Sequence, residues 1–245
     1  MKKTLICLLL ALMLPCLSLA DRGTVTIIEG EEKSAPELPL AGYKIGIDPG
    51  HQLHGDNSRE PVAPGSSETK AKVATGTSGV YTHKAEHETN LEIALLLRDL
   101  LVDMGAEVLM TRETADVNIS NVECATMMNE WGADAVVRLH CNGSTNHSVH
   151  GMGMYVRKTG EKAEESEALA RCLLSSMTAR TGARAQGVYK RDTYSGLNWS
   201  QVPSVLVEMG YMTNPDEDRK LNDPDYQLLI VLGIADGLTE YLTHR

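Results

Sequence analysis

The chain has 245 residues and a formal net charge of −10 at pH 7, with 23 Lys and Arg against 33 Asp and Glu. Negative charge of this size disfavours adhesion to polyanions, which excludes a nucleic-acid partner held by charge and electrostatic attachment to an anionic surface. Any polymer on which the protein acts must therefore be recognised locally, by a specific site.

Residues 1–20 have the pattern of a secretory signal peptide. Lys2 and Lys3 precede an apolar run from Leu5 to Leu17, and small residues follow up to Ala20. No later apolar run is long enough to span a membrane. We expect a cleaved signal and a soluble, exported protein, either secreted to the extracellular cell wall or periplasmic.

Five cysteines are present, of which Cys124, Cys141 and Cys172 remain after residue 20. An odd number does not form a disulfide framework, and the spacing favours no particular pair. Cys16 suggests a lipid anchor, but Pro15 stands where such a site requires a small residue, so anchoring is disfavoured.

Residues 21–40 are polar and without period, which predicts a linker, and the folded domain is expected at 41–245. Within it, buried strands are predicted at 44–51, 107–111, 133–140 and 204–208. Two helices are predicted from their capping boxes, one from 89–92 to Gly105 and one from 120–123 to Gly132. A third helix is predicted to end at Gly182, and a fourth to begin at Asp223. This alternation predicts an α/β fold, with a single domain whose mainly parallel twisted sheet has helices on both faces.

The stretch between His51 and Asn90 has no periodicity and is rich in Gly, Ser, Thr and Pro. Long structureless connections in compact domains are usually functional or disordered. This connection begins at the candidate ligand His51 and ends near a cluster of His and Glu at 83–88. We therefore interpret it as a loop that faces substrate.

Three predicted strands end in His51, His140 and Glu208, and the carboxyl ends of parallel strands share one edge of a sheet. Catalytic zinc takes three ligands from His, Glu or Asp and leaves a position open for water. The third ligand is open among His83, Glu86, His87 and Glu88. A metal-bound water also needs an uncoordinated acid to take its proton and pass it to the leaving amine, and Glu208 fits that role.

Five segments between residues 42 and 241 carry a resemblance to a known family. They are Ile47-Asp48-Pro49-Gly50-His51, Glu86 with Asn90-Leu91, Met110-Thr111-Arg112, Leu139-His140-Cys141-Asn142-Gly143, and the stretch 205–214. They resemble the zinc-dependent N-acetylmuramoyl-L-alanine amidases of bacterial cell-wall turnover that carry a single catalytic α/β domain. The family pattern usually has glycines and a short connection after the first histidine, where this chain has Gln52-Leu53-His54 and the long loop.

The resemblance implies Zn²⁺ bound by His51, Glu86 and His140, with Glu208 as the catalytic acid/base. It also implies peptidoglycan or a muropeptide as substrate, cleaved between N-acetylmuramic acid and L-alanine. Two other functions stay open: a zinc amidohydrolase or peptidase that acts on another amide, and a noncatalytic cell-wall-binding protein on the same fold.

Each candidate also has a structural interpretation. Glu208 is then a buried acid paired with Arg112 or Arg138, Asp48 a turn residue, and Asn90 either a helix-start residue or a partner that orients a ligand. The remaining histidines are expected to be solvated loop residues: His54, His83, His87, His147 and His150. Trp199, just before the last strand, is proposed as a stacking surface for sugar or peptide.

Overall fold

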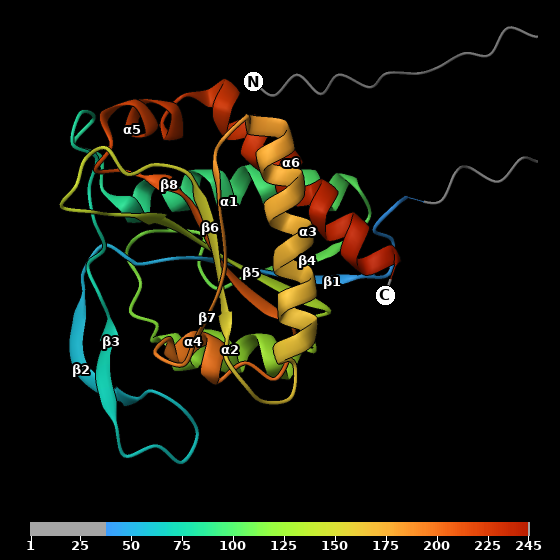
Figure 1. Ribbon diagram of the computed structural model, residues 1–245. Helices are drawn as coiled ribbons and strands as arrows, with labels where there is room; N and C mark the ends of the chain where they lie inside the picture. The colour runs from blue at the N-terminus through green and yellow to red at the C-terminus, as the bar shows by residue number, and fades with distance from the viewer. Residues whose placement is uncertain (1–37, 245) are drawn as a thin grey trace, which may run out of the picture. The chain divides into compact units, whose positions relative to one another are not determined.

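The computed structural model describes residues 38–244. Its centre is a sheet of six strands (Figure 1). The strand order is β4-β1-β5-β8-β6-β7. Their bounds are β1 (Lys44–Pro49), β4 (Glu107–Met110), β5 (Ala135–Asn142), β6 (Met152–Arg157), β7 (Ala185–Arg191) and β8 (Ser204–Tyr211). The signal-peptide prediction and most of the predicted linker lie outside the described residues.

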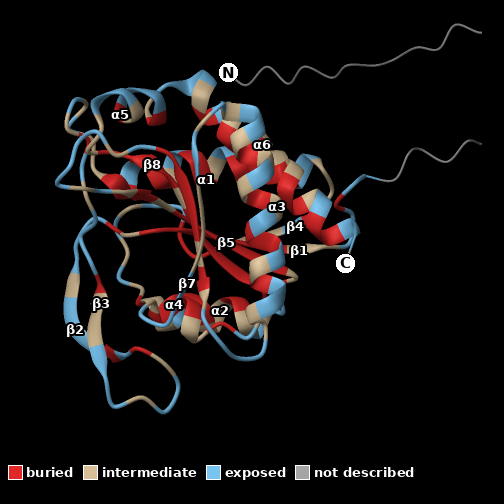
Figure 2. Cartoon of the chain, viewed as in Figure 1, coloured by how far each residue is buried: buried red, intermediate tan, exposed pale blue. Residues whose placement is uncertain are grey.

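The four strands from β4 to β8 run parallel, whereas β6 is antiparallel to β8 and β7 is parallel to β6. The predicted α/β fold with a mainly parallel sheet is therefore confirmed, and the sheet is mixed at one side. The central strands are nearly continuous runs of apolar residues, because a sheet covered on both faces has no solvated side. Figure 2 shows these strands as buried along most of their length.

Helices cover both faces of the sheet, as predicted (Figure 1). One face carries α1 (Glu86–Asp103), α3 (Ala163–Thr181) and α6 (Pro224–Thr243), and the other carries α2 (Asn121–Trp131) and the short α4 (Ser195–Asn198). The larger apolar core lies under α1, α3 and α6, where side chains such as Ile93, Leu169 and Ile234 are fully buried. A further short helix, α5 (Pro215–Leu221), follows β8.

Most predicted helix ends are confirmed. The Ser120 side chain caps α2, Gly132 and Gly182 end α2 and α3 in the left-handed conformation, and Asp223 caps α6 ahead of Pro224. The capping box predicted at 89–92 is wrong, because α1 begins at Glu86.

The start of α1 is capped in a different way. Its N-cap is Ala85, whose N–H donates to Glu88 Oε2 at 3.1 Å, while the Thr89 hydroxyl donates to Asn222 on the turn after α5 instead of capping. An alanine N-cap gives no side-chain signal, so the sequence pattern placed the start one turn too late.

The long connection after His51 is not structureless, which corrects the prediction. It holds an antiparallel hairpin of β2 (Asp56–Pro61) and β3 (Thr69–Val73), which stands outside the central sheet (Figure 1). The polar sequence of β2 lacks the apolar alternation by which strands are recognised. The hairpin is fastened to the α4 region, since Trp199 Nε1 donates to Pro61 O at 3.0 Å and Asn198 Nδ2 to Val62 O at 2.9 Å.

Leu40 already belongs to the packed structure: it is fully buried and its N–H donates to Met104 O at 3.0 Å. Within residues 38–244, no helix is both long and apolar enough to cross a membrane. The three cysteines of this part of the chain, Cys124, Cys141 and Cys172, are unpaired thiols.

Candidate metal centre

The predicted site residues meet in a cleft of about 510 Å³ at the carboxyl edge of the parallel strands. His51 follows β1, whereas His140 and Glu208 lie within β5 and β8, which continue past them. His140 and Glu208 are opposite each other in the register of these two strands. Glu86, the first residue of α1, completes the group.

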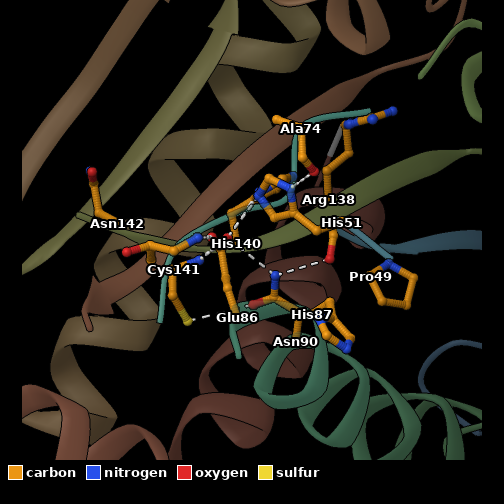
Figure 3. A network of polar contacts seen from close by, with 12 residues as sticks. Pro49, His51, Ala74, Glu86, His87, Asn90, Arg138, His140, Cys141 and Asn142 are labelled. Atoms are coloured by element: carbon orange, nitrogen blue, oxygen red, sulfur yellow. Dashed lines mark hydrogen bonds and ion pairs between the residues drawn. The ribbon is translucent and has the colours of Figure 1, made fainter. Parts of the chain in front are cut away.

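Three ligand atoms converge in this cleft (Figure 3). His51 Nε2 and His140 Nδ1 are 3.2 Å apart, and Glu86 Oε1 lies 3.1 Å from the first nitrogen and 3.3 Å from the second. Tetrahedral zinc with bonds of about 2.0–2.1 Å places its ligand atoms about 3.3–3.4 Å apart. The donors of His51, Glu86 and His140 therefore fit a zinc ion in type and in spacing.

His51 is held in an unusual backbone conformation, with a φ of 62°. A residue other than glycine at positive φ costs on the order of 1–3 kcal/mol and persists only when the surrounding structure enforces it. The ring is fixed by the contact of its Nδ1 with Ala74 O at 2.7 Å, which leaves Nε2 free to bind a metal. Burial disfavours the charged ring, but the hydrogen bond and charge of Glu86 raise the pKa of His51 overall.

The Glu86 carboxylate is held by backbone donors on both sides. Cys141 N–H donates to Oε1 at 3.0 Å, and Thr77 N–H donates to Oε2 at 2.9 Å. Burial alone would raise the pKa of Glu86, but its contacts with His140 and His51 lower it far more. Glu86 is therefore ionised and held in place by the protein's own donors, as suits a metal ligand.

The His140 ring packs against backbone and has no room to turn. A Cβ atom on Gly50 would lie 2.3 Å from His140 Cε1, so only glycine fits there. Burial is the largest influence on His140 and lowers its pKa, which keeps the imidazole neutral and able to coordinate. Cys141 is buried and its Sγ–H contacts Asn90 Oδ1, which agrees with the packing role predicted for it.

Glu208 has a buried carboxyl oxygen, Oε2, for which residues 38–244 provide no hydrogen-bond partner. Burial, together with the negative charge of Glu86, raises the pKa of Glu208 to about 8. The alternative interpretation as a partner of Arg112 or Arg138 is wrong, since neither forms an ion pair with it. A buried acid left unpaired beside a ligand set is a strong candidate for proton transfer.

The comparisons with known proteins agree with this geometry. A family model, Amidase_3, described as N-acetylmuramoyl-L-alanine amidase, matches residues 45–240. The chain belongs to this family. A relative from Mycobacterium tuberculosis, the N-acetylmuramoyl-L-alanine amidase Rv3717, is 31% identical over 221 residues, which cover 84% of this chain and 90% of the relative.

Other family members are longer. The match to the amidase LytC of Bacillus subtilis, 29% identical, covers 83% of this chain but 36% of LytC. The match to the probable cell wall amidase LytH of Staphylococcus epidermidis covers 62% of that protein. Among solved structures, the amidase Ami1 of Mycobacterium smegmatis superimposes with a TM-score of 0.77 at 25% identity, covering 84% of this chain and 99% of Ami1. The fold is that of amidase catalytic domains.

Two residues hold the loops of the candidate ligands together: Asn90, for which orienting a ligand was one of two interpretations of the sequence, and Arg112, whose role was not predicted. Asn90 is fully buried on α1, and its Nδ2 donates to Gly50 O at 3.2 Å and Glu86 Oε1 at 3.3 Å, so it orients a ligand and does not start the helix. Arg112 donates to Pro49 O, Gly50 O and His87 O at 2.9, 3.1 and 3.0 Å. Arg112 thus ties the loop before His51 to the first turn of α1.

Asp48 is a buried member of β1 and not a simple turn residue. Its Oδ2 lies 2.8 Å from Arg138 Nη2, too bent for a hydrogen bond but close as an ion pair, and its Oδ1 accepts from the Thr111 hydroxyl at 2.6 Å. Burial opposes the charged form, yet Arg138 and Thr111 lower the pKa of Asp48 overall.

The remaining candidates lie away from the ligand group. His83 and Glu88 are exposed, as are His54, His147 and His150. His87 corrects the prediction of a solvated loop residue, because it is buried on α1. Trp199 does not line the cleft, and its indole holds the hairpin; the aromatic ring in the cleft lining is Tyr194. The sequence signal that could have indicated Tyr194 as a residue of the cleft is its position next to the segment 195–199.

Proposed function

We propose that this family member is a zinc-dependent N-acetylmuramoyl-L-alanine amidase that cleaves the amide between N-acetylmuramic acid and L-alanine in peptidoglycan. The observation that carries the proposal is the carboxyl group of Glu208, whose buried Oε2 has no hydrogen-bond partner in residues 38–244, beside the convergent donors of His51, Glu86 and His140. Family membership supports the amidase activity, and the donor geometry supports zinc.

When bound, zinc polarises the amide carbonyl and lowers the pKa of a water molecule. The chain's own residues do the rest. His51, Glu86 and His140 hold the ion, and their charge states suit the role, because Glu86 is ionised and His140 is neutral. Glu208 lies in register with His140 and can reach the same space from β8.

Glu208 moves the proton. Its carboxylate takes one proton from the attacking water, a new C–O bond forms at the lactyl carbonyl, and Glu208 returns the proton to the nitrogen as the C–N bond breaks. The products are a lactyl carboxylate and a peptide with a free L-alanine amine. Without a metal, burial and Glu86 raise the pKa of Glu208 to about 8 and favour its protonated form. The positive charge of a bound zinc ion would favour the carboxylate form that takes the proton.

The test is to measure zinc content and amine release from purified peptidoglycan for the wild type, Glu208→Ala and His51→Ala. We expect about one zinc per chain and new L-alanine N-termini for the wild type, zinc without amine release for Glu208→Ala, and loss of both for His51→Ala. Glu130→Ala, which removes an exposed acid on α2, is the matched control. Full activity of Glu208→Ala refutes the assignment, and bound zinc without amine release by the wild type points to another amide or to a binding protein.

We further propose that residues 1–20 direct export and are removed, that 21–40 act as a linker, and that the protein works outside the cytoplasmic membrane, secreted or periplasmic. The charged, apolar and small-residue regions of 1–20 support this. N-terminal sequencing of protein from the native host tests it: a start at Asp21 is expected, and an intact Met1 refutes it.

A further inference from the structure

The active-site cleft has one cationic side chain that comes from the hairpin and not from the sheet. Lys70, on β3, lines the same cleft as His51, Glu86 and Glu208. Its neighbours in the lining include Tyr194 at the start of α4. The hairpin therefore contributes a charge to a cleft whose candidate metal donors and Glu208 come from β1, α1, β5 and β8 or the residues next to them.

Lys70 forms no ion pair with an acid of the described chain, although the charge of Glu60 on the paired strand stabilises its ammonium. Within residues 38–244 its ammonium forms no ion pair, and its contacts are a hydrogen bond to Thr193 O at 3.3 Å and the Tyr194 ring, whose centroid is 5.8 Å away. Glu60 is its cross-strand neighbour, but Glu60 Oε2 accepts from Val122 N–H at 3.1 Å. Lys70 keeps at least one N–H group for a ligand.

Arg138, the other cation in the cleft lining, differs from Lys70 because Asp48 already balances its charge. Burial lowers the pKa of Lys70, and Arg138 adds to this through like-charge repulsion, whereas Glu60 opposes it. Lys70 is half-buried, and a cation that is partly withdrawn from water is stabilised by an anionic partner. The arrangement at Lys70 is that of a cation awaiting an anionic group within the cleft.

The proposed substrate supplies such a group. The peptide that begins with L-alanine continues in peptidoglycan with a residue whose α-carboxyl group is either free or amidated. We propose that Lys70 is a specificity residue that binds this carboxylate, so that the enzyme prefers the free acid to the amide. This inference rests on the proposed function and names the form of substrate that it takes.

The test compares two muramoyl peptides that differ only in this group, one with the free carboxylate and one with the carboxamide. For the wild type we expect kcat/KM to favour the carboxylate about tenfold, as for a charge-assisted hydrogen bond in a partly exposed site. Lys70→Met is expected to bring the ratio close to one, mainly through KM, and Lys70→Arg to restore most of it.

Lys72→Met is the matched control. It removes the same charge from the same strand, two residues along, but Lys72 does not line the cleft. Its ratio should equal that of the wild type. An equal change in Lys72→Met would show a general effect of charge and overturn the inference.

Failure of the inference about Lys70 and failure of the proposed function give different results. If the wild type cleaves both substrates with equal kcat/KM, or if Lys70→Met slows both equally, Lys70 only holds the Thr193 segment and the inference is wrong while the amidase stands. If the wild type cleaves neither, the proposed function itself fails. A thermal unfolding curve for each variant identifies any loss caused by misfolding.

Discussion

Gly50 lies directly against the imidazole of His140, so closely that a Cβ atom would sit 2.3 Å from Cε1 and 2.4 Å from Nε2. The glycine that ends the motif before His51 is thus required by a residue 90 positions later, on another strand. Its backbone φ is not positive, so the reason is the space beside the ring.

Gly50→Ala is therefore expected to push the His140 ring aside and to lower zinc affinity roughly 10–100-fold, the range seen when support for a metal ligand is lost. Competition with a chromogenic chelator measures it. Gly132→Ala is the control, because that glycine has a φ of 73° and open space, so the variant loses stability without touching the site. Equal zinc affinity in Gly50→Ala and the wild type would contradict the prediction.

Removal of the Arg112 guanidinium should weaken both the fold and the site. Arg112→Met leaves the buried carbonyls of Pro49 and His87 without their donor, which costs about 1–3 kcal/mol for each. We expect a lower midpoint in urea and weaker zinc binding, because the loop before His51 is no longer tied to α1. Arg171→Met, at an exposed ion pair, should change neither, and native zinc affinity in Arg112→Met would speak against the tether.

The Asp48–Arg138 pair gives a signature in acid unfolding. The folded-state pKa of Asp48 is lowered, so the ionised group stabilises the fold above its unfolded pKa of about 3.9, and this contribution is lost as pH falls through the lower folded value. Asp48→Asn should cost roughly 3–5 kcal/mol near pH 7, because it leaves Arg138 buried without its ion-pair partner.

The measurement is the free energy of unfolding of the wild type and Asp48→Asn from pH 2 to 7, in the presence of a chelator. The difference between them should be constant above about pH 5 and shrink below about pH 4. Asp116→Asn, at an exposed carboxylate, provides the reference. A difference that does not change with pH would show that the pKa of Asp48 is the same in both states.

The attachment of the hairpin can be tested at Asn198, whose Nδ2 donates to Val62 O at 2.9 Å and to Asp192 O at 2.8 Å. Asn198→Ala should speed hydrogen exchange of residues 56–73 and raise KM with little change in kcat, since no ligand or proton-transfer group is touched. The exposed Gln201 provides the control variant Gln201→Ala. Unchanged exchange across the hairpin would show that other contacts hold it.

The sequence predicted those elements whose signals are local. The ends of α2 and α6 followed from Ser120 and Asp223, and the parallel strands from their apolar runs. The start of α1 was placed too late because Ala85 carries no capping group. Strands β2, β3, β6 and β7 were not predicted. The two hairpin strands are largely polar, and the other two belong to the side of the sheet that is antiparallel to β8, away from the strand–helix alternation.

Only those site residues that a local signal marks were predicted from the sequence pattern. His51, His140 and Glu208 were marked by their places near strand ends, but chemistry alone left four choices for the third ligand, and only the family resemblance selected Glu86. The structure brings Glu86 Oε1 to the two ring nitrogens. An orienting role for Asn90 was one of two interpretations of the sequence, whereas the role of Arg112 depends on carbonyls far away along the chain, which no local pattern reveals.

The three donors are also far apart along the polypeptide: His140 is 54 residues from Glu86 and 89 from His51. In an unfolded chain a single ion could join them only by closing two long loops, which is entropically costly. A cation would thus bind the finished fold in strong preference to the open chain and stabilise it by mass action. Metal uptake would then report that β1, α1 and β5 have all assembled, and a chain that has not yet folded would remain inactive.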